Sequence, residues 1–320
     1  MIPISYSDSK GLLDIHYKSI LNYLEGPRMK NKFAQLEKLI DEFSNKEYTF
    51  KSLVQASFPT IKERIVPLWS AFPTNQKVNF SKSIGLIGNL YSYLGKSKHY
   101  SFTDAGGGVI YYNTEYLFRR LNIKVCPYCN ENYTYHFSNN GRRNYDLDHF
   151  YSQSEFPILA ISLYNLVPSC KVCNFFKLDS DASVLSPHEV YDVDELMTYQ
   201  IKPVSSDYLI SDDAFSIEAL VSLGHKHETS IEHNIQVFKL IERYKERRDI
   251  VYDVIRKKQI YSEEYIKQLF EQYEGLLFSS LEQVKSLVYG ASLDASGYHN
   301  RPFSKLIKDV FEDPSFKTGL

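Results

Sequence analysis

Four cysteines and a few polar residues near them carry the chemistry that this sequence suggests. The cysteines form two C-x2-C pairs, Cys126 with Cys129 and Cys170 with Cys173, separated by residues 130–169. Two such pairs have the spacing of a tetrahedral zinc site in which each pair forms one knuckle around the metal. We therefore expect a structural zinc ion on the four cysteines.

Polar residues in the same stretch have the properties of a hydrolytic site. Hydrolysis of a phosphodiester needs a water molecule, a group that takes its proton, and positive charge on the phosphate. His149 can take the proton, because imidazole titrates near neutral pH. Asp148 and Asn174 offer the hard oxygen ligands that Mg²⁺ and Mn²⁺ prefer, and two protein ligands leave positions open for phosphate and water.

These motifs, in this order, resemble the HNH endonucleases of the ββα-metal class, in the subgroup braced by a four-cysteine zinc. The first motif is Y-D-L-D-H-F at 145–150, and the second is N-L-V-P-S-C-K-V-C-N-F-F-K at 165–177. The resemblance covers a small part of the 320 residues. It implies an enzyme, an endonuclease that hydrolyses phosphodiester bonds.

The resemblance also implies a role for each matching residue. Asp148 and Asn174 would bind the catalytic Mg²⁺ or Mn²⁺, and His149 would be the general base. Asn165 would brace the loop that carries the histidine. Lys177 would contact a phosphate, and its alternative is a solvated position on a helix surface.

Three alternatives use the same cysteines. The first is a non-catalytic zinc scaffold that binds nucleic acid or a protein partner. The C-P-Y-C motif at 126–129 also resembles the redox motif of glutaredoxins and the iron knuckle of rubredoxins. A glutaredoxin motif follows a strand and opens a helix, whereas residues 131–137 are aromatic and β-branched and therefore predict a strand.

The candidate site requires a particular order of elements. We predict strands at 131–138 and 143–149, joined by an Asn-Asn-Gly turn at 139–141. The second strand would end at the histidine. A long loop at 150–163 would follow, and a short helix at 171–177 would present the asparagine ligand.

The fold class we predict is α+β, with a small four-cysteine-zinc ββα-metal (HNH) module embedded between mainly α-helical segments. Residues 1–120 would form an N-terminal helical region, because apolar residues recur at helical spacing, for example over 33–43. Residues 121–182 would form the zinc-braced HNH nuclease module. Residues 183–320 would be mixed and then helical, with two or three long helices over 231–288.

Three further patterns have ordinary interpretations. His225, His227 and His233 could suggest a second metal site, but a polar loop entering a helix explains them better. The basic run at 242–258 contains interleaved glutamates and is best interpreted as a solvated helix face rather than a phosphate-binding surface. The Gly-Lys-Ser at 95–97 lacks the preceding glycine of a P-loop, so we interpret it as a turn.

The formal net charge of −2 bears on the partners. It requires that any DNA-binding surface be a local basic patch, or that a partner supply part of the affinity. The layout also resembles HNH subunits of bacterial anti-phage systems such as Septu, which work beside an ATPase. This resemblance implies a defence effector with DNA as substrate and an ATPase partner subunit. RNA as substrate and the oligomeric state are left open.

Localisation follows from what the sequence lacks. The N-terminal residues show no basic region followed by an apolar run, and no apolar run approaches the ~20 residues of a membrane span. Four cysteines that one metal site would use completely suit a reducing compartment. We therefore expect a cytoplasmic protein with no membrane partner.

Overall fold

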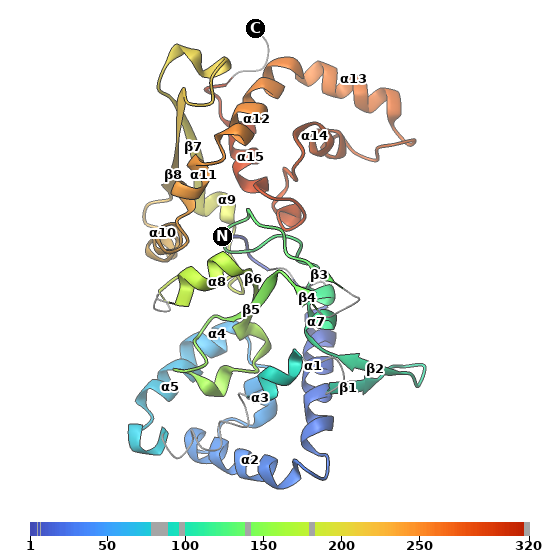
Figure 1. Cartoon of the computed structure of the whole chain (residues 1–320), viewed down its shortest axis with the longest axis vertical. Coiled ribbons are helices and arrows are strands. Elements are labelled where there is room, and N and C mark those ends of the chain that lie inside the picture. The colour runs from blue at the N-terminus through green and yellow to red at the C-terminus, as the bar shows by residue number, and fades with distance from the viewer. Residues whose placement is uncertain are drawn as a thin grey trace. The chain divides into compact units, whose positions relative to one another are not determined.

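The computed structural model describes residues 1–4, 6, 8–77, 89–95, 100–137, 142–178 and 183–316. The predicted turn at 139–141, most of the turn at 95–97 and the predicted boundary at 182 lie outside these residues. The described chain is a mixed α and β structure in which helices predominate and the strands form two-stranded sheets (Figure 1). This confirms the mixed fold class in its coarse form.

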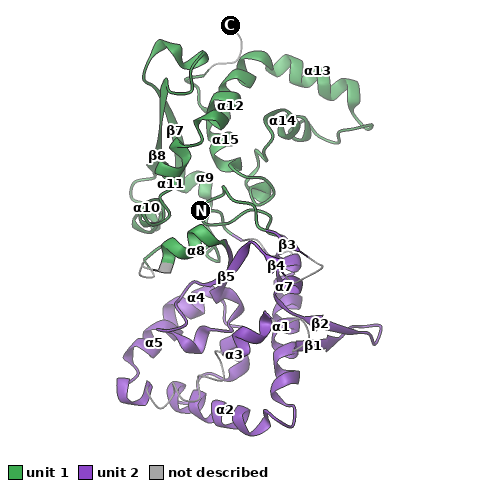
Figure 2. Ribbon diagram, viewed as in Figure 1, with its two compact units in different colours: residues 1–3, 123–134, 170–320 green, residues 4–122, 135–169 purple. Residues whose placement is uncertain are grey.

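The chain forms two compact units that interleave in sequence (Figure 2). Unit 1 contains Met1–Pro3, Ile123–Thr134 and Cys170–Leu320, and unit 2 contains Ile4–Asn122 and Tyr135–Ser169. The regions 1–120, 121–182 and 183–320 were predicted from the positions of the motifs rather than from compactness. This division stays a prediction.

Unit 2 begins with helices whose ends carry identifiable caps. The Asp8 side chain accepts from the Gly11 N–H at the start of the first helix, and Asn45, at φ 49°, ends the second. The second helix contains residues 33–43 and confirms the helix that their apolar spacing predicted. The helical segments are α1 Ser9–Leu24, α2 Lys30–Ser44, α3 Phe50–Val54, α4 Phe58–Thr60, the π-helical η1 Ile61–Ile65, α5 Val66–Ala71 and α7 Thr114–Leu121.

Among the described residues, three two-stranded sheets belong wholly or mainly to unit 2. Strands β1 (Tyr100–Thr103) and β2 (Val109–Tyr112) form an antiparallel hairpin that the sequence did not predict. Asp104 closes its turn by accepting from the N–H groups of Gly106 and Gly108. The remaining strands are β3 His136–Phe137, β4 Arg142–Arg143, β5 Tyr145–His149 and β6 Leu166–Cys170, with the short 3-10 helices η2 Pro157–Leu159 and η3 Leu163–Asn165 between the last two.

The strand pairing around the predicted site differs from the expectation. Strand β3 pairs with β4, whereas β5, which ends at His149, pairs with β6. The stretch predicted as one strand at 131–138 is divided, because residues 132–134 pair back onto residues 124–126. The chain order β5, β6, α8 (Lys171–Leu178) is therefore strand, strand, helix. The predicted helix at 171–177 is confirmed.

Unit 1 combines one hairpin with a series of short helices. Strands β7 and β8 are antiparallel, with Met197 opposite Val221 and Pro203 opposite Phe215. The stretch predicted as two or three long helices contains five shorter ones, and Lys239, at φ 52°, separates the first two. The elements after α8 are α9 Val193–Leu196, β7 Met197–Pro203, η4 Ser206–Leu209, β8 Phe215–Val221, α10 Glu228–Val237, α11 Leu240–Lys245, α12 Arg248–Ile260, α13 Glu263–Tyr273, α14 Leu281–Tyr289, η5 Ala295–Gly297 and α15 Ser304–Glu312.

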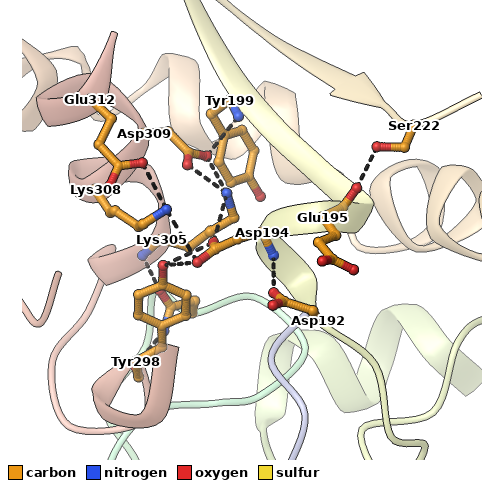
Figure 3. Close-up of polar contacts among 11 residues, drawn as sticks. Asp192, Asp194, Glu195, Tyr199, Ser222, Tyr298, Lys305, Lys308, Asp309 and Glu312 are labelled. Carbon is orange, nitrogen blue, oxygen red and sulfur yellow. Dashed lines mark hydrogen bonds and ion pairs between the residues drawn. The ribbon is translucent and has the colours of Figure 1, made fainter. Parts of the chain in front are cut away.

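A buried polar network holds α15 against β7 and α9 (Figure 3). The Lys305 ammonium contacts both carboxylate oxygens of Asp309, at 2.5 and 2.7 Å, and Asp194 at 3.2 Å. Asp309 accepts from the Tyr199 N–H over 2.7 Å, and the Tyr298 hydroxyl donates to Asp194 over 2.9 Å. A buried ammonium is tolerated only when it is paired in this way, so the network fixes the position of α15.

No helix within the described residues has both the length and the apolar composition that a membrane crossing requires.

Candidate functional site

The four cysteine side chains gather in unit 1 as a buried cluster that could hold one metal ion. Their sulfur atoms all lie within 4.8 Å of one another, and each residue is a free thiol. The Sγ atoms of Cys129 and Cys170 are 4.0 Å apart. Ligands at Zn–S distances of about 2.3 Å in a tetrahedron would be roughly 3.8 Å apart. The predicted four-cysteine metal-binding cluster is therefore confirmed.

The protonation of these sulfurs also favours a cation among them. Burial raises the pKa of the Cys126 and Cys173 thiols, whereas hydrogen bonds from the other cysteines lower that of Cys170. Four buried sulfurs at this separation cannot all be thiolates alone, because like charges repel strongly where the dielectric constant is low. A divalent ion such as Zn²⁺ would supply the missing charge, so the donor set fits zinc.

The first knuckle is a turn at 126–130 that Asn130 closes. The Asn130 N–H donates to the Cys126 carbonyl over 2.8 Å, and its φ of 48° lies in the left-handed region that asparagine tolerates. Its side chain donates to the Tyr298 carbonyl over 2.8 Å and accepts from the Lys305 N–H over 3.2 Å. Asn130 therefore joins the knuckle to the segment that begins α15.

Amide groups also surround the sulfur of Cys170. The Asn132 side chain donates to it over 3.4 Å, and the Cys173 N–H lies 3.5 Å from it. Such N–H···S contacts stabilise a thiolate and therefore suit a metal ligand.

Arg243 on α11 is a neighbour of the cluster that the sequence analysis placed in a basic run. Its Nη1 donates to Cys173 Sγ over 3.4 Å, and its Nη2 forms an ion pair with Glu131. Burial acts to lower the pKa of Arg243, but the sulfurs of Cys129 and Cys173 and the Glu131 carboxylate outweigh burial and raise it. No motif could have identified Arg243, because it follows Cys173 by seventy positions in the chain.

A second cation of the same basic run is also buried. Lys258 donates from Nζ to the carbonyl oxygens of Val310 and Asp313, over 3.3 and 2.9 Å. The interpretation of residues 242–258 as a solvated helix face is therefore wrong for Arg243 and Lys258. Each of them finds its acceptors inside unit 1.

The surroundings of the first cysteine pair contradict the glutaredoxin-like alternative. A thiol of that kind lies at a helix N-terminus, which lowers its pKa. Here residues 126–130 form a turn, and the chain then returns along itself. The Cys126 N–H donates to the Asn132 carbonyl and the Thr134 N–H to the Lys124 carbonyl, each over 2.9 Å.

The rings of His225 and His227 lie 5.4 Å apart, but the three histidines that could suggest a second metal site do not form a described group able to share one ion. Among the side chains that the structure describes, the four cysteines are the only group of three or more His, Cys, Asp and Glu residues close enough to share an ion.

His149 is the last residue of β5, in unit 2, as predicted. Its Nε2 lies 2.9 Å from the carbonyl oxygen of Ala160. Because a carbonyl oxygen can only accept, Nε2 must carry the hydrogen, and the lone pair of the neutral ring is on Nδ1. The contact therefore selects the tautomer in which Nδ1 can act as a base.

Asn165 is fully buried and ties together both ends of the segment that follows His149. Its Oδ1 accepts from the Tyr151 N–H over 2.7 Å, and its Nδ2 donates to the carbonyls of Tyr151 and Leu159, each over 3.1 Å. Its own carbonyl accepts from the Phe150 N–H over 2.8 Å. Leu159 directly precedes the carbonyl that contacts His149, so Asn165 holds the backbone that orients the imidazole.

Tyr91 is a second contact of His149, and the sequence analysis missed it. The two ring centroids lie 4.2 Å apart at an angle of 55°. The Tyr91 hydroxyl donates over 2.7 Å to the carbonyl of Leu147, two residues before the histidine. Burial raises the pKa of Tyr91 to about 12, with Asp148 adding to burial and the nearby Arg143 opposing it. The phenol therefore stays protonated and can donate at neutral pH.

The other predicted site residues fall in both units. Asp148 is 7% exposed and directly precedes His149 in β5, in unit 2. Asn174, half-buried, and Lys177, 8% exposed, lie on α8 in unit 1. Lys177 therefore does not occupy the solvated helix surface that was its alternative. The roles predicted for these three residues, and for His149 and Asn165, stay predictions.

Comparison with known proteins adds no relative. None of the protein-family models, curated proteins or solved structures that were compared with the chain matches it.

Proposed function

We propose that this protein is a metal-dependent HNH endonuclease that hydrolyses phosphodiester bonds in DNA. The observation that carries the proposal is the state of His149. It directly follows an aspartate at the end of a strand, and its Nε2–H contact with Ala160 leaves Nδ1 as the basic nitrogen. The four-cysteine cluster and the strand–strand–helix order of β5, β6 and α8 are further support.

The proposed reaction is attack of water on the phosphorus atom. Nδ1 of His149 takes a proton from the water while the water oxygen forms the new bond to phosphorus. The bond from phosphorus to the leaving sugar oxygen breaks, and that oxygen takes a proton from solvent. When bound, Mg²⁺ or Mn²⁺ supplies positive charge that stabilises the developing negative charge on the phosphate. Asp148 and Asn174 would hold this ion, and their assignment rests on the sequence pattern.

The proposal gives the four-cysteine cluster a structural role, with zinc as its ion. The cluster has four protein ligands and is buried, so no coordination position is left for a substrate. Zinc would close the two knuckles and stabilise unit 1. The rubredoxin-like alternative is an iron ion in the same place, and metal analysis decides between the two.

The test is cleavage of supercoiled plasmid by the purified full-length protein with Mg²⁺ or Mn²⁺. We expect wild type to nick or linearise the plasmid and His149→Ala to reduce the rate by about 10²- to 10⁴-fold, because a general base is lost. His225→Ala, a histidine outside the proposed site, is the matched control and should cleave normally. All three proteins should contain about one zinc ion per chain.

The second candidate function is a non-catalytic zinc scaffold that binds nucleic acid or a protein partner. The confirmed cysteine cluster favours it equally, because structural zinc sites are common in binding modules. The scaffold predicts that His149→Ala leaves biological activity unchanged, whereas the nuclease predicts its loss. Equal cleavage by wild type and His149→Ala would eliminate the catalytic role of His149.

We extend the proposal to a role as effector of a bacterial anti-phage system with an ATPase partner. The absence of a complete P-loop from these 320 residues agrees with an ATPase as a separate partner subunit. Expression of the protein together with its ATPase partner in bacterial cells should protect the cells from phage, and His149→Ala should abolish the protection.

A further inference from the structure

Helix α8 of unit 1 (Figure 2) buries one of its sides and exposes the other. At about 100° per residue, the buried Cys173 and Lys177 lie on one side of the helix. The other side carries Lys171, Val172 and Phe175. Because Cys173 belongs to the metal cluster, the cluster decides which side of α8 is turned outward.

Phe175 carries the most exposed ring of this helix. At 65% it is more exposed than any other Phe, Tyr or Trp side chain that the structure describes. Val172, about one turn earlier, is 45% exposed, and the half-buried Phe176 has its ring centroid 6.1 Å from that of Phe175. Burial of an apolar side chain is favourable, so neighbouring apolar residues on an outward side indicate a binding surface.

The backbone beneath these residues is held in place. The Cys173 N–H lies 3.5 Å from the Cys170 sulfur, and Arg243 on α11 donates to Cys173 Sγ over 3.4 Å. Both contacts lie within unit 1, as does the cluster itself. The exposed ring is therefore carried by a supported helix, and rigid elements position binding side chains most precisely.

The proposed function identifies the partner of this surface. Asn174, which would hold the catalytic ion, directly precedes Phe175 on α8. An ion bound there must meet the scissile phosphate, so the DNA substrate has to approach this helix. The charge agrees, because the segment 165–178 contains two lysines and no acidic residue, and Lys171 is exposed beside the apolar side chains.

The chemistry of the exposed side chains limits what they can do to DNA. Val172, Phe175 and Phe176 have no hydrogen-bonding group, so they cannot read base edges through hydrogen bonds. Apolar side chains contact the methyl group of thymine or insert between neighbouring base pairs as a wedge. A ring that is 65% exposed stands out from its helix, which favours insertion.

We propose that Phe175 inserts between two base pairs of the DNA substrate and partly unstacks them. Val172 and Phe176 then cover the opened step, and Lys171 contacts a flanking phosphate. Because unstacking costs free energy, the wedge favours base-pair steps that unstack easily, such as TA and CA/TG, and Phe175 is therefore a specificity-determining residue. The inference deepens the proposed nuclease function and rests on it for the identity of the partner.

The test is the fluorescence of a DNA duplex that carries 2-aminopurine at a central TA step, with the full-length protein and no added Mg²⁺ or Mn²⁺. This base fluoresces more strongly when it is unstacked, so wild type should raise the emission on binding. Phe175→Ala should leave the emission at the level of the free duplex and weaken binding, measured by anisotropy of an end label, about tenfold.

A second duplex, with a single mismatch at the same step, tests the cost of unstacking. The mismatch weakens the stacking beforehand, so wild type should bind this duplex about tenfold more tightly than the matched one. Phe175→Ala should bind the two duplexes equally, because it has no wedge to insert.

Matched variants separate the wedge from other effects. Leu287→Ala removes an apolar side chain of nearly equal exposure, 64%, from α14 in the same unit, and should change neither emission nor affinity. Phe175→Leu keeps an apolar wedge and should retain part of the emission increase. Lys171→Gln should reduce the slope of log affinity against log salt by about 0.9, the value for one phosphate contact with a duplex.

Three outcomes would overturn the inference. The first is unchanged emission and affinity in Phe175→Ala. The second is no emission increase with wild type together with weaker binding when uracil replaces thymine, which would assign the ring to a thymine methyl group. The third is a wild-type dimer that Phe175→Ala converts to a monomer with unchanged DNA binding, which would assign the surface to a second copy of the chain.

Because unstacking is measured without cleavage, the two proposals fail separately. His149→Ala should raise the emission as wild type does, since His149 is not part of the wedge. Cleavage that depends on His149 without unstacking would refute only the wedge, and unstacking that depends on Phe175 without cleavage would refute only the nuclease.

Discussion

Asn165 offers the sharpest test of how the segment after His149 is held. The substitution Asn165→Ala removes three side-chain hydrogen bonds, one from the Tyr151 N–H and two to the carbonyls of Tyr151 and Leu159. All of these groups are buried. Each net hydrogen bond contributes about 1 kcal/mol, and a buried partner left unsatisfied costs more. We therefore expect the free energy of unfolding of unit 2 to fall by about 3 kcal/mol.

The single tryptophan provides the assay. Trp69 is buried in unit 2 and donates from Nε1 to the Glu155 carbonyl over 2.8 Å, within the same segment that Asn165 braces. Urea denaturation followed by its fluorescence should show a lower midpoint with little change in slope. Asn22→Ala is the control, because this asparagine is exposed and donates from Nδ2 to the Ser101 carbonyl over 3.1 Å.

The result that would refute the reasoning is a loss for Asn165→Ala no larger than that for Asn22→Ala. The backbone groups of Tyr151 and Leu159 that Asn165 contacts would then be satisfied by water or by a shifted backbone. A second consequence concerns His149, because the carbonyl that selects its tautomer directly follows Leu159. If the proposed nuclease cleaves DNA, Asn165→Ala should lower the cleavage rate even at temperatures where unit 2 stays folded.

The remaining predictions concern protonation, the imidazole contacts and the metal. Burial lowers the pKa of His16 from 6.5 to about 4, so the unfolded chain takes up a proton at a higher pH than the folded chain does. The stability that the neutral, buried His16 contributes is therefore fully present above pH 6.5, and about 3 kcal/mol of it should be lost as the pH falls toward 4. Denaturation at both pH values should show that His16→Leu removes this loss. Tyr91→Phe keeps the ring and loses the bond to the Leu147 carbonyl, so the cleavage rate should fall about fivefold with a changed pH profile, whereas Tyr91→Ala should cost more. Chelation of the cluster metal should reduce the helical circular dichroism, because structural zinc contributes on the order of 10 kcal/mol to folding; retention of the full signal would contradict a structural role. Arg243→Met removes the cation beside the cysteine cluster and should speed zinc transfer to a chromogenic chelator by about tenfold, with Arg256→Met, in the same basic run, unchanged.

Local patterns in the sequence were sufficient to predict the four-cysteine cluster and individual helices. The two C-x2-C pairs predicted a cluster that the structure confirms, because each pair fixes its own knuckle within a few residues. The helix over 171–177 and the apolar pattern over 33–43 were predicted for the same reason. Such features depend on periodicity and spacing, which the sequence shows directly.

Contacts between distant residues were not predictable in this way. Residues 131–138 have the composition of one strand, but closure of the knuckle pairs part of it with 124–126 and leaves β5 to pair with β6. Tyr91 reaches Leu147 over fifty-six positions and Arg243 reaches Cys173 over seventy. Nothing in their local composition distinguishes these side chains from ordinary core or surface residues, because their roles arise from tertiary packing.

The interleaving of the two units has a consequence for synthesis of the chain. All of unit 2 has been made when residue 169 is added, whereas the partner of Asn130 in the first knuckle is Lys305, 175 positions later. At a rate of about 5–20 residues per second this interval is roughly 10–35 s. During that time Cys126 and Cys129 lack the α15 segment that holds their turn. A nascent chain should therefore bind metal weakly until the α15 segment has been synthesised, which would delay maturation of the metal site of unit 1 relative to the folding of unit 2.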